Sequence, residues 1–235
     1  MKRVIALLLS LLVAFPSWAA VAIHDVAAPY EQDGGTSITA SFTTTTGATK
    51  LVACASLEDG TSTFSVTGAT WNGDTVTAAV QKKNPGGSRY TSIWYIDTPD
   101  IGTADFVLTS DETISDWGLV ILSLRGTATG VKDTDEFSSD SDTTATFSLT
   151  GIVATDFILT CAIDAIETHT WTHGAGQTEL FDFDFGPATP SARISSSWEL
   201  GEAAPSSTTS DPTAIAIVAA AFSEARRRAK PKVFP

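Results

Sequence analysis

Two histidines in the second half of the chain have the spacing of metal ligands. His169 and His173 are four residues apart, and Asp164 and Glu167 come just before them. On a strand, residues four apart lie on the same face, so two imidazoles and a carboxylate are available for zinc. No motif fixes a third ligand, and a glycine loop follows directly. We therefore expect a pair of surface histidines, with no metal and no cofactor.

The densest acidic segment offers the hard oxygen ligands that calcium prefers. Residues 133–136 have the sequence DTDE, and residues 138–142 have the sequence SSDSD. The segment lacks the spaced glycine and the closing glutamate of a known calcium loop. We expect a solvated loop on the surface instead.

The sequence contains no recognised catalytic signature. GxSxG, HExxH, P-loop and GxGxxG patterns are all absent. Serines and aspartates are numerous, but no spacing selects a Ser/His/Asp triad. A carboxylate pair for glycoside hydrolysis stays open, because any acidic chain supplies candidates. The residues therefore favour a protein that is not an enzyme.

Four tryptophans divide into two kinds by position. Trp94 and Trp198 fall within apolar runs and are expected in the core. Trp71 and Trp171 stand beside turns, where exposed rings could stack on sugar faces. We take Trp71 and then Trp171 as the candidate ligand-binding residues; packing in the core or against the turn is the alternative for both.

The hydrophobic pattern is that of β-strands almost throughout. No window shows a sustained helical period, whereas short apolar or alternating runs recur between turn residues. Asn72-Gly73 is the clearest local signal, since both residues tolerate the positive φ of a two-residue hairpin. The pattern predicts an all-β fold, an antiparallel, jelly-roll-like β-sandwich. The expected strands are residues 37–42, 50–56, 62–67, 70–71, 74–80, 91–96, 104–109, 117–124, 145–149, 156–162, 169–172, 178–185, 194–200 and 214–222.

The two halves of this domain share a succession of landmarks. Residues 37–130 contain a phenylalanine, a strand ending in Cys54, an xTW triplet, an SxW triplet and an apolar run. Residues 143–224 contain the same series around Cys161. A degenerate internal duplication explains this order, and chance similarity between short strands is the alternative. The acidic join, residues 126–142, is expected to be a surface loop.

The first residues have the form of a secretory signal peptide. Lys2 and Arg3 precede an apolar run that is too short to span a bilayer, and small residues follow a helix-breaking proline. We expect residues 1–19 to be removed, with an uncleaved membrane anchor as the alternative. Residues 20–36 then form an N-terminal segment, residues 37–224 a single domain, and residues 225–235 a basic tail.

Charge is distributed very unevenly along the chain. The formal net charge is −13, yet only seven Lys and Arg lie between the two basic termini, against all 27 Asp and Glu. Such a body repels nucleic acid and anionic lipid, so we expect no nucleic-acid partner. It stays soluble outside the cell and attracts cations.

Cys54 and Cys161 lie inside apolar runs, where free cysteine behaves as a small hydrophobe. Export would permit a disulfide between them. From the apolar surroundings we favour two buried free thiols at corresponding core positions, with the disulfide as the alternative.

Several segments resemble an uncharacterised module of bacterial exported and surface proteins and of some phage virion proteins. The resemblance covers residues 37–224 and implies one β-sandwich unit with no catalytic motif to transfer. Asp97-Thr98-Pro99 stands where Asn-Pro is usual, and the acidic loop and basic tail lie outside the pattern. The matching segments are residues 51–56 (LVACAS), 66–73 (VTGATWNG), 92–99 (SIWYIDTP), 102–103 (GT), 120–126 (VILSLRG), 174–178 (GAGQT), 197–200 (SWEL) and 214–222.

Taken together, the sequence favours an exported, non-enzymatic β-sandwich, secreted, at the cell surface or in the periplasm. Its expected role is surface adhesion, glycan binding or extracellular assembly, with a glycan or further copies of itself as the partner. A structural subunit of a filament, matrix or phage virion is the first alternative. A polysaccharide-active enzyme is the second.

Overall fold

The computed structural model describes residues 20–59, 64–164, 169–185, 192–211 and 213–225, and its secondary structure is entirely β. All strand pairs are antiparallel, which confirms the all-β, sandwich-like fold expected from the sequence. Within these ranges no helix is long and apolar enough to cross a membrane. The expected signal peptide and nearly all of the basic tail lie outside the described residues.

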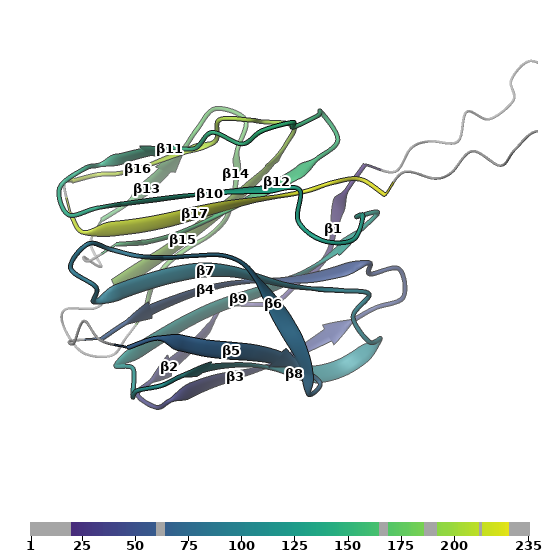
Figure 1. Ribbon diagram of the computed structural model, residues 1–235, viewed down its shortest axis with the longest axis horizontal. Coiled ribbons are helices and arrows are strands. Elements are labelled where there is room, and N and C mark those ends of the chain that lie inside the picture. The colour runs from purple at the N-terminus through teal and green to yellow at the C-terminus, as the bar shows by residue number, and fades with distance from the viewer. Residues whose placement is uncertain (1–19, 60–63, 165–168, 186–191, 212, 226–235) are drawn as a thin grey trace, which may run out of the picture.

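The first half is one nine-stranded sheet that curls around its own core (Figure 1). The curl depends on β6, whose first residues pair with β5 and whose later residues pair with β7. The order across the sheet is β1-β9-β4-β7-β6-β5-β8-β3, with β2 also on β9. The strands are β1 (Ala22–Val26), β2 (Tyr30–Asp33), β3 (Ser37–Thr44), β4 (Lys50–Glu58), β5 (Val66–Trp71), β6 (Asp74–Lys83), β7 (Arg89–Asp97), β8 (Gly102–Ser110) and β9 (Asp116–Arg125).

The second half consists of two separate sheets. A five-stranded sheet has the order β10-β17-β12-β15-β14, and a three-stranded sheet has the order β11-β16-β13. The strands are β10 (Asp133–Ser139), β11 (Thr144–Thr146), β12 (Phe157–Asp164), β13 (Trp171–His173), β14 (Thr178–Phe185), β15 (Ala192–Leu200), β16 (Ser206–Thr209) and β17 (Ile215–Phe222).

The two halves repeat one topology. In both, the same succession of strands along the chain yields the same order across the sheets, so β1-β9-β4-β7-β6 corresponds to β10-β17-β12-β15-β14 and β5-β8-β3 to β13-β16-β11. β2 has no counterpart among the described strands. This shared topology supports the internal duplication inferred from the sequence landmarks.

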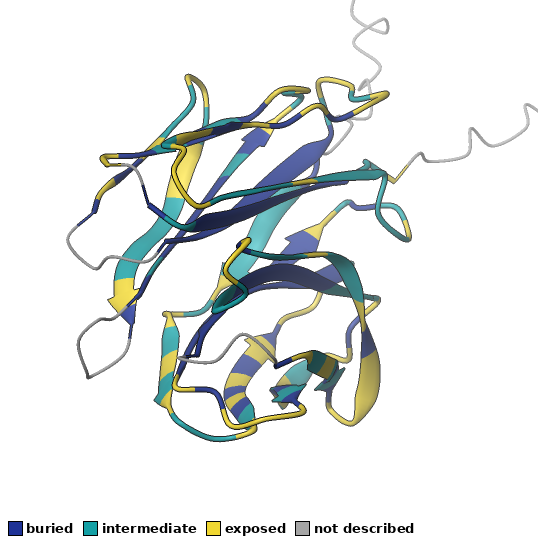
Figure 2. Cartoon of the chain, turned by 60° about the vertical axis from the view of Figure 1, so that its left-hand side comes forward, coloured by how far each residue is buried: buried dark blue, intermediate teal, exposed yellow. Residues whose placement is uncertain are grey.

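Four β layers enclose three hydrophobic cores. The first core fills the curled sheet, the second lies between the two halves, and the third lies between the two sheets of the second half. Strands β4, β12 and β17 are buried on both faces (Figure 2), which explains their continuous apolar sequences. The outer strand β3 alternates buried and exposed residues, because one of its faces meets solvent.

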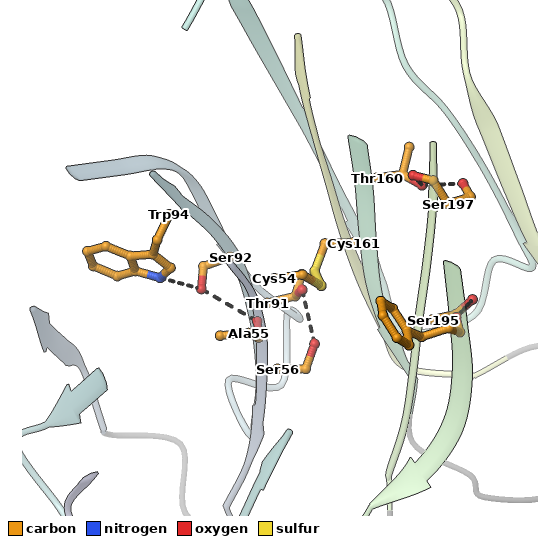
Figure 3. The surroundings of a disulfide bond; sticks show 11 residues. Cys54, Ala55, Ser56, Thr91, Ser92, Trp94, Thr160, Cys161, Ser195 and Ser197 are labelled. Atoms are coloured by element: carbon orange, nitrogen blue, oxygen red, sulfur yellow. Dashed lines mark hydrogen bonds between the residues drawn. A yellow bond between two sulfur atoms is a disulfide. The ribbon is translucent and has the colours of Figure 1, made fainter. Parts of the chain in front are cut away.

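A disulfide joins the two halves at the centre of their interface. Cys54 on β4 and Cys161 on β12 are both wholly buried, with Cα atoms 5.9 Å apart (Figure 3). Their positions correspond: Cys54 lies opposite Val120 on β9, and Cys161 lies opposite Val218 on β17. The predicted correspondence of the cysteines is therefore confirmed, and the prediction of free thiols is wrong. Apolar surroundings alone do not show that two buried cysteines face each other.

Two segments expected to lie outside the sheets are strands. Within the expected surface loop, Asp133–Ser139 forms β10 at the edge of the five-stranded sheet. Two of its carboxylates pair with neighbouring backbone: Asp133 and Asp135 accept hydrogen bonds from the N–H groups of Thr150 and Ser148. The N-terminal segment likewise supplies β1 and β2, so the first sheet begins at Ala22.

The Asn72-Gly73 hairpin is confirmed. It connects β5 to β6, with positive φ at both residues (51° and 87°). Both central residues of a type I′ turn require this conformation.

Removing the disulfide should destabilise the protein substantially. Because it closes a separation of 107 residues, we expect Cys54→Ala and Cys161→Ala each to lower the free energy of unfolding by about 2–5 kcal/mol. The double variant should lose little more than either single one, since one bond is removed in all three. Urea unfolding measures this. Two free thiols in the denatured, unreduced wild type would contradict the assignment.

Candidate functional site

The structure places both candidate ligand-binding tryptophans inside the protein. Trp71 is 0% exposed and packs edge-to-face on Phe42, with ring centroids 6.3 Å apart. Trp171 is 5% exposed and belongs to the third core. The predicted stacking surface is therefore wrong at both residues. Alternation along a strand directs Trp71 inward with Ala69, even though the next residue begins an exposed hairpin.

The mid-strand tryptophans occupy opposite faces. Trp94 is buried in the first core and donates its indole N–H to Ser92 Oγ at 2.8 Å, pointing away from the disulfide (Figure 3). Trp198 is partly buried and stacks on Phe157 beside the interface. Strand register explains the difference: Cys54 lies opposite Ile93 and Cys161 opposite Ser196, so Trp94 corresponds to Ser197 rather than to Trp198.

The two histidines have separate partners in the interior of the second half. His169 is 5% exposed, 3.7 Å from an Asp164 carboxylate oxygen and 3.4 Å from Thr209 Oγ1. His173 contacts serines instead, and Glu167 lies outside the described residues. The expectation of surface histidines is wrong for His169. In the described part of the chain, no group of three or more His, Cys, Asp and Glu is placed to hold a metal ion.

His173 is the centre of a buried polar network between β13, β15 and β16. Its Nε2 lies 3.0 Å from Ser195 Oγ, and its Nδ1 lies 3.1 Å from Ser207 Oγ. When the Ser195 hydroxyl donates to the carbonyl of Phe181, Nε2 supplies the hydrogen that this hydroxyl accepts. Nδ1 is then the acceptor for Ser207. Burial lowers the pKa of His173, which favours this neutral imidazole.

The network continues along the inner face of β15. Ser197 Oγ lies 2.6 Å from Thr160 Oγ1 and accepts a hydrogen bond from Gln177 at 2.8 Å. The Gln177 side-chain carbonyl accepts from the backbone N–H groups of Gly174 and Ser206. These contacts hold the Gly174–Gln177 loop, conspicuous in the sequence as GAGQ, against the strands on both sides of it.

The position of this network follows from a difference between the halves. In the first half, β6 pairs with both β5 and β7 and so connects the two sides of the sandwich. In the second half, β14 pairs with β15 and β13 with β16, and the described residues form no ladder between β13 and β14. The seam that results needs polar side chains, because its backbone is not covered by a strand ladder. The alternating serines of β15 supply them.

The Ser195–His173 pair has the distance of a nucleophile and its base, but not the chemistry. A general base must accept the hydroxyl proton, whereas here Nε2 donates and that proton goes to a backbone carbonyl. The residue on Nδ1 is a serine rather than a carboxylate, and Ser195 is 0% exposed. Ser207, whose hydroxyl donates to Nδ1, is only 1% exposed, so neither serine that contacts His173 is accessible to a substrate in this structure.

A buried carboxyl lies on the same strand. Glu199 is 6% exposed, and its Oε1 has no hydrogen-bond partner within the described residues. Burial, reinforced by the negative charge of Glu202, raises its pKa from 4.5 to about 7. The side chain is consequently neutral in the folded protein under mildly acidic conditions.

The first half contains an open hollow where β5 and β6 diverge. The two strands pair only near the hairpin, and β6 then leaves β5 to join β7. The hollow has a volume of about 260 Å³ and combines an aromatic ring with amide, hydroxyl and ammonium groups. We call it the fork pocket; it is lined by Ser65, Val66, Gln81, Lys82, Lys83 and Tyr90.

Lys83 gives the fork pocket a positive charge in a strongly acidic protein. Its ammonium donates to the Phe64 carbonyl and lies 4.3 Å from the centroid of the Phe64 ring. Among the described side chains, no carboxylate lies within ion-pair distance of it. Lys82, by contrast, pairs with Glu136 of β10 at 2.8 Å. Lys83 therefore keeps a charge that an anionic ligand can neutralise.

Comparison of the chain with protein-family models, with curated proteins and with solved structures finds no match in any of the three. The evidence for the fork pocket and the seam as sites is therefore their geometry alone. Sequence reasoning missed both. The adjacent Lys82 and Lys83 in a body with so few basic residues were the available signal for the pocket. The seam depends on which strands pair, which no local motif reports.

Glu199→Gln should change the pH dependence of stability. A folded-state pKa of about 7 means that the neutral carboxyl stabilises the fold below pH 4.5 and that this contribution is lost as the pH rises through 7. At pH 8 the variant should therefore be more stable than wild type, by on the order of 1–3 kcal/mol. The gain should disappear by about pH 4.5.

Thermal unfolding at a series of pH values measures the effect. Glu179→Gln, at an exposed position on β14, is the matched control and should leave the profile unchanged. If the unfolding temperatures of wild type and Glu199→Gln run parallel at all pH values, folding does not raise the pKa of Glu199, and the prediction is wrong.

Proposed function

We propose that this chain is an exported, non-catalytic β-sandwich protein that acts by binding at the cell surface or in its surroundings. The observation that carries the proposal is the disulfide between Cys54 and Cys161. Disulfides persist in oxidising compartments outside the cytoplasm and are rare within it. The signal-peptide-like residues 1–19 provide an independent reason to expect export.

The interior supports a binding role over a catalytic one. Its two close Ser–His contacts within the described residues, from Ser195 and Ser207 to His173, involve serines that are 0% and 1% exposed. The cores between the layers are filled by apolar side chains and leave the outer surfaces for interaction. A rigid framework with binding groups on its periphery is typical of extracellular sandwich modules.

Export and oxidation should depend on the first residues. Full-length protein produced in a bacterial host should appear outside the cytoplasm with its N-terminus at Ala20 or within a few residues of it, and without free thiols. The same chain lacking residues 2–19 should stay in the cytoplasm with both thiols reduced. N-terminal peptide mapping and thiol titration read these results. Intact Met1 on protein from the culture supernatant would contradict the proposal.

The fork pocket favours glycan binding among the expected roles. Gln81 and Ser65 offer an amide and a hydroxyl. The largely buried Tyr90 also lines the pocket, and its hydroxyl donates to Gln81 Oε1 at 2.8 Å. Such a mixture suits sugar hydroxyl groups. Because Lys83 lacks a carboxylate partner in the described structure, the ligand we infer is a sugar that carries a carboxylate or sulfate. This site replaces Trp71 and Trp171, whose rings are buried.

Acidic oligosaccharides should therefore bind in preference to neutral ones of the same length. Lys83→Met should reduce that binding at least tenfold, and moderate salt should weaken binding to wild type, because the contact is electrostatic. Titration calorimetry with uronic-acid and neutral oligosaccharides measures both effects. Lys132→Met, which removes a lysine remote from the pocket in sequence and paired with Asp156, is the control. Equal binding of acidic and neutral sugars would refute this assignment.

A further inference from the structure

Lys50 is a fully buried lysine on the strand that carries the disulfide. Its side chain is 0% exposed, although lysine is almost never buried to this extent without a specific partner. It stands four residues before Cys54 on β4 and therefore on the same face, which packs against the second half. Its ammonium lies 4.6 Å from the ring centroid of Tyr95 and 5.4 Å from that of Phe222.

The carboxylate partner of Lys50 is Asp97, directly opposite on β7. Lys50 Nζ donates a hydrogen bond to Asp97 Oδ1, and the two form an ion pair. Burial lowers the pKa of the Lys50 ammonium, and the contact with Asp97 opposes that shift. In such surroundings the neutral amine becomes accessible when the ammonium passes one proton along the hydrogen bond.

The backbone of Gly130, in the connection between the halves, holds both groups. Its carbonyl accepts a second hydrogen bond from Lys50 Nζ at 2.9 Å. Its N–H donates to Asp97 Oδ2 at 2.8 Å. The carbonyl therefore orients the amine, and the N–H is placed to stabilise negative charge that develops on the carboxyl oxygen.

We propose that Lys50 and Asp97 react within the folded protein to form an intramolecular isopeptide bond between Nζ and Cγ. The geometry points to this reaction because one fully buried amine faces one carboxyl across adjacent strands, and Gly130 orients both groups; the Lys50 side chain is 0% exposed and the Asp97 side chain 27%. Such positioning replaces the encounter of two free groups and supplies much of the barrier reduction in a condensation.

The atoms balance without a further reactant. The ammonium transfers one proton to Asp97 Oδ1, which leaves a neutral amine and a carboxylic acid. The amine lone pair attacks Cγ, and the Gly130 N–H stabilises the charge on Oδ2. The Cγ–Oδ1 bond then breaks, and Oδ1 leaves as water with a second proton from Nζ. The product is an amide, and neither group is oxidised or reduced.

The other lysine–carboxylate pairs in the described structure lack this combination. Lys132 reaches buried Asp156 at 2.5 Å, but the lysine side chain is 23% exposed. Lys82 is partly exposed and its partner Glu136 is exposed. Lys50 alone among the three has no solvent-accessible surface. Lys132→Met is therefore a control that removes a lysine–aspartate pair without removing the proposed link.

Mass spectrometry of the purified, denatured protein tests the proposal. After the mature N-terminus has been determined, wild type should be lighter than its oxidised sequence mass by one water. A tryptic digest should contain the Lys50 and Asp97 segments in one cross-linked peptide, uncleaved after Lys50. Lys132→Met should retain the loss of water, whereas Lys50→Met and Asp97→Ala should each restore the full mass.

The mass and peptides of wild type test the isopeptide bond even if a variant fails to fold. A wild-type mass that includes the water, together with separate peptides for the two segments and cleavage after Lys50, would overturn the proposal and leave an ordinary buried ion pair. The outcome is independent of the proposed binding function, because it concerns a bond within the framework.

Discussion

The packing of the two halves against each other is the constraint on which the rest of the structure depends. The second core lies between sheets that also cover a core on their other face, so the central strands need apolar side chains on both sides. That requirement produces the continuous apolar runs and places charge and threonine on the outer layers. At about 25 cal/mol per Å² of buried apolar surface, a shared core of this kind stabilises both halves at once. The disulfide and the Lys50–Asp97 contact lie on the same interface and reinforce it.

The two halves share one topology but differ in what lies at the corresponding edge of each. In the first, β6 connects both sides of the sandwich and leaves the fork pocket where it departs from β5. In the second, the corresponding edge stays open and is filled by His173, Gln177 and the serines of β15. The internal copies thus differ most at one edge. That edge supplies an accessible, positively charged hollow in one half and a sealed hydrogen-bonded seam in the other.

Much of the fold could be predicted from the sequence, because strand period and turn chemistry are local. The apolar runs through Cys54 and Cys161 predicted strands, and Asn72-Gly73 predicted its hairpin. Predictions failed where a residue's surroundings depend on which strand or sheet packs against it. Trp71 belongs to the core because of the phase of its strand, and the cysteines are bonded because two sheets face each other. The acidic strand β10 was missed since an edge strand can satisfy its carboxylates with solvent and neighbouring backbone. The site residues were harder still, because the fork pocket exists only where one strand changes partners.

The two sandwiches should form one cooperative unit through their shared core. Differential scanning calorimetry of the mature, oxidised protein tests it most directly, by comparing the calorimetric enthalpy of unfolding with the van 't Hoff enthalpy. We expect a single transition in which the two enthalpies agree. Two separate transitions, or a calorimetric enthalpy about twice the van 't Hoff value, would show that the halves unfold independently and would contradict it.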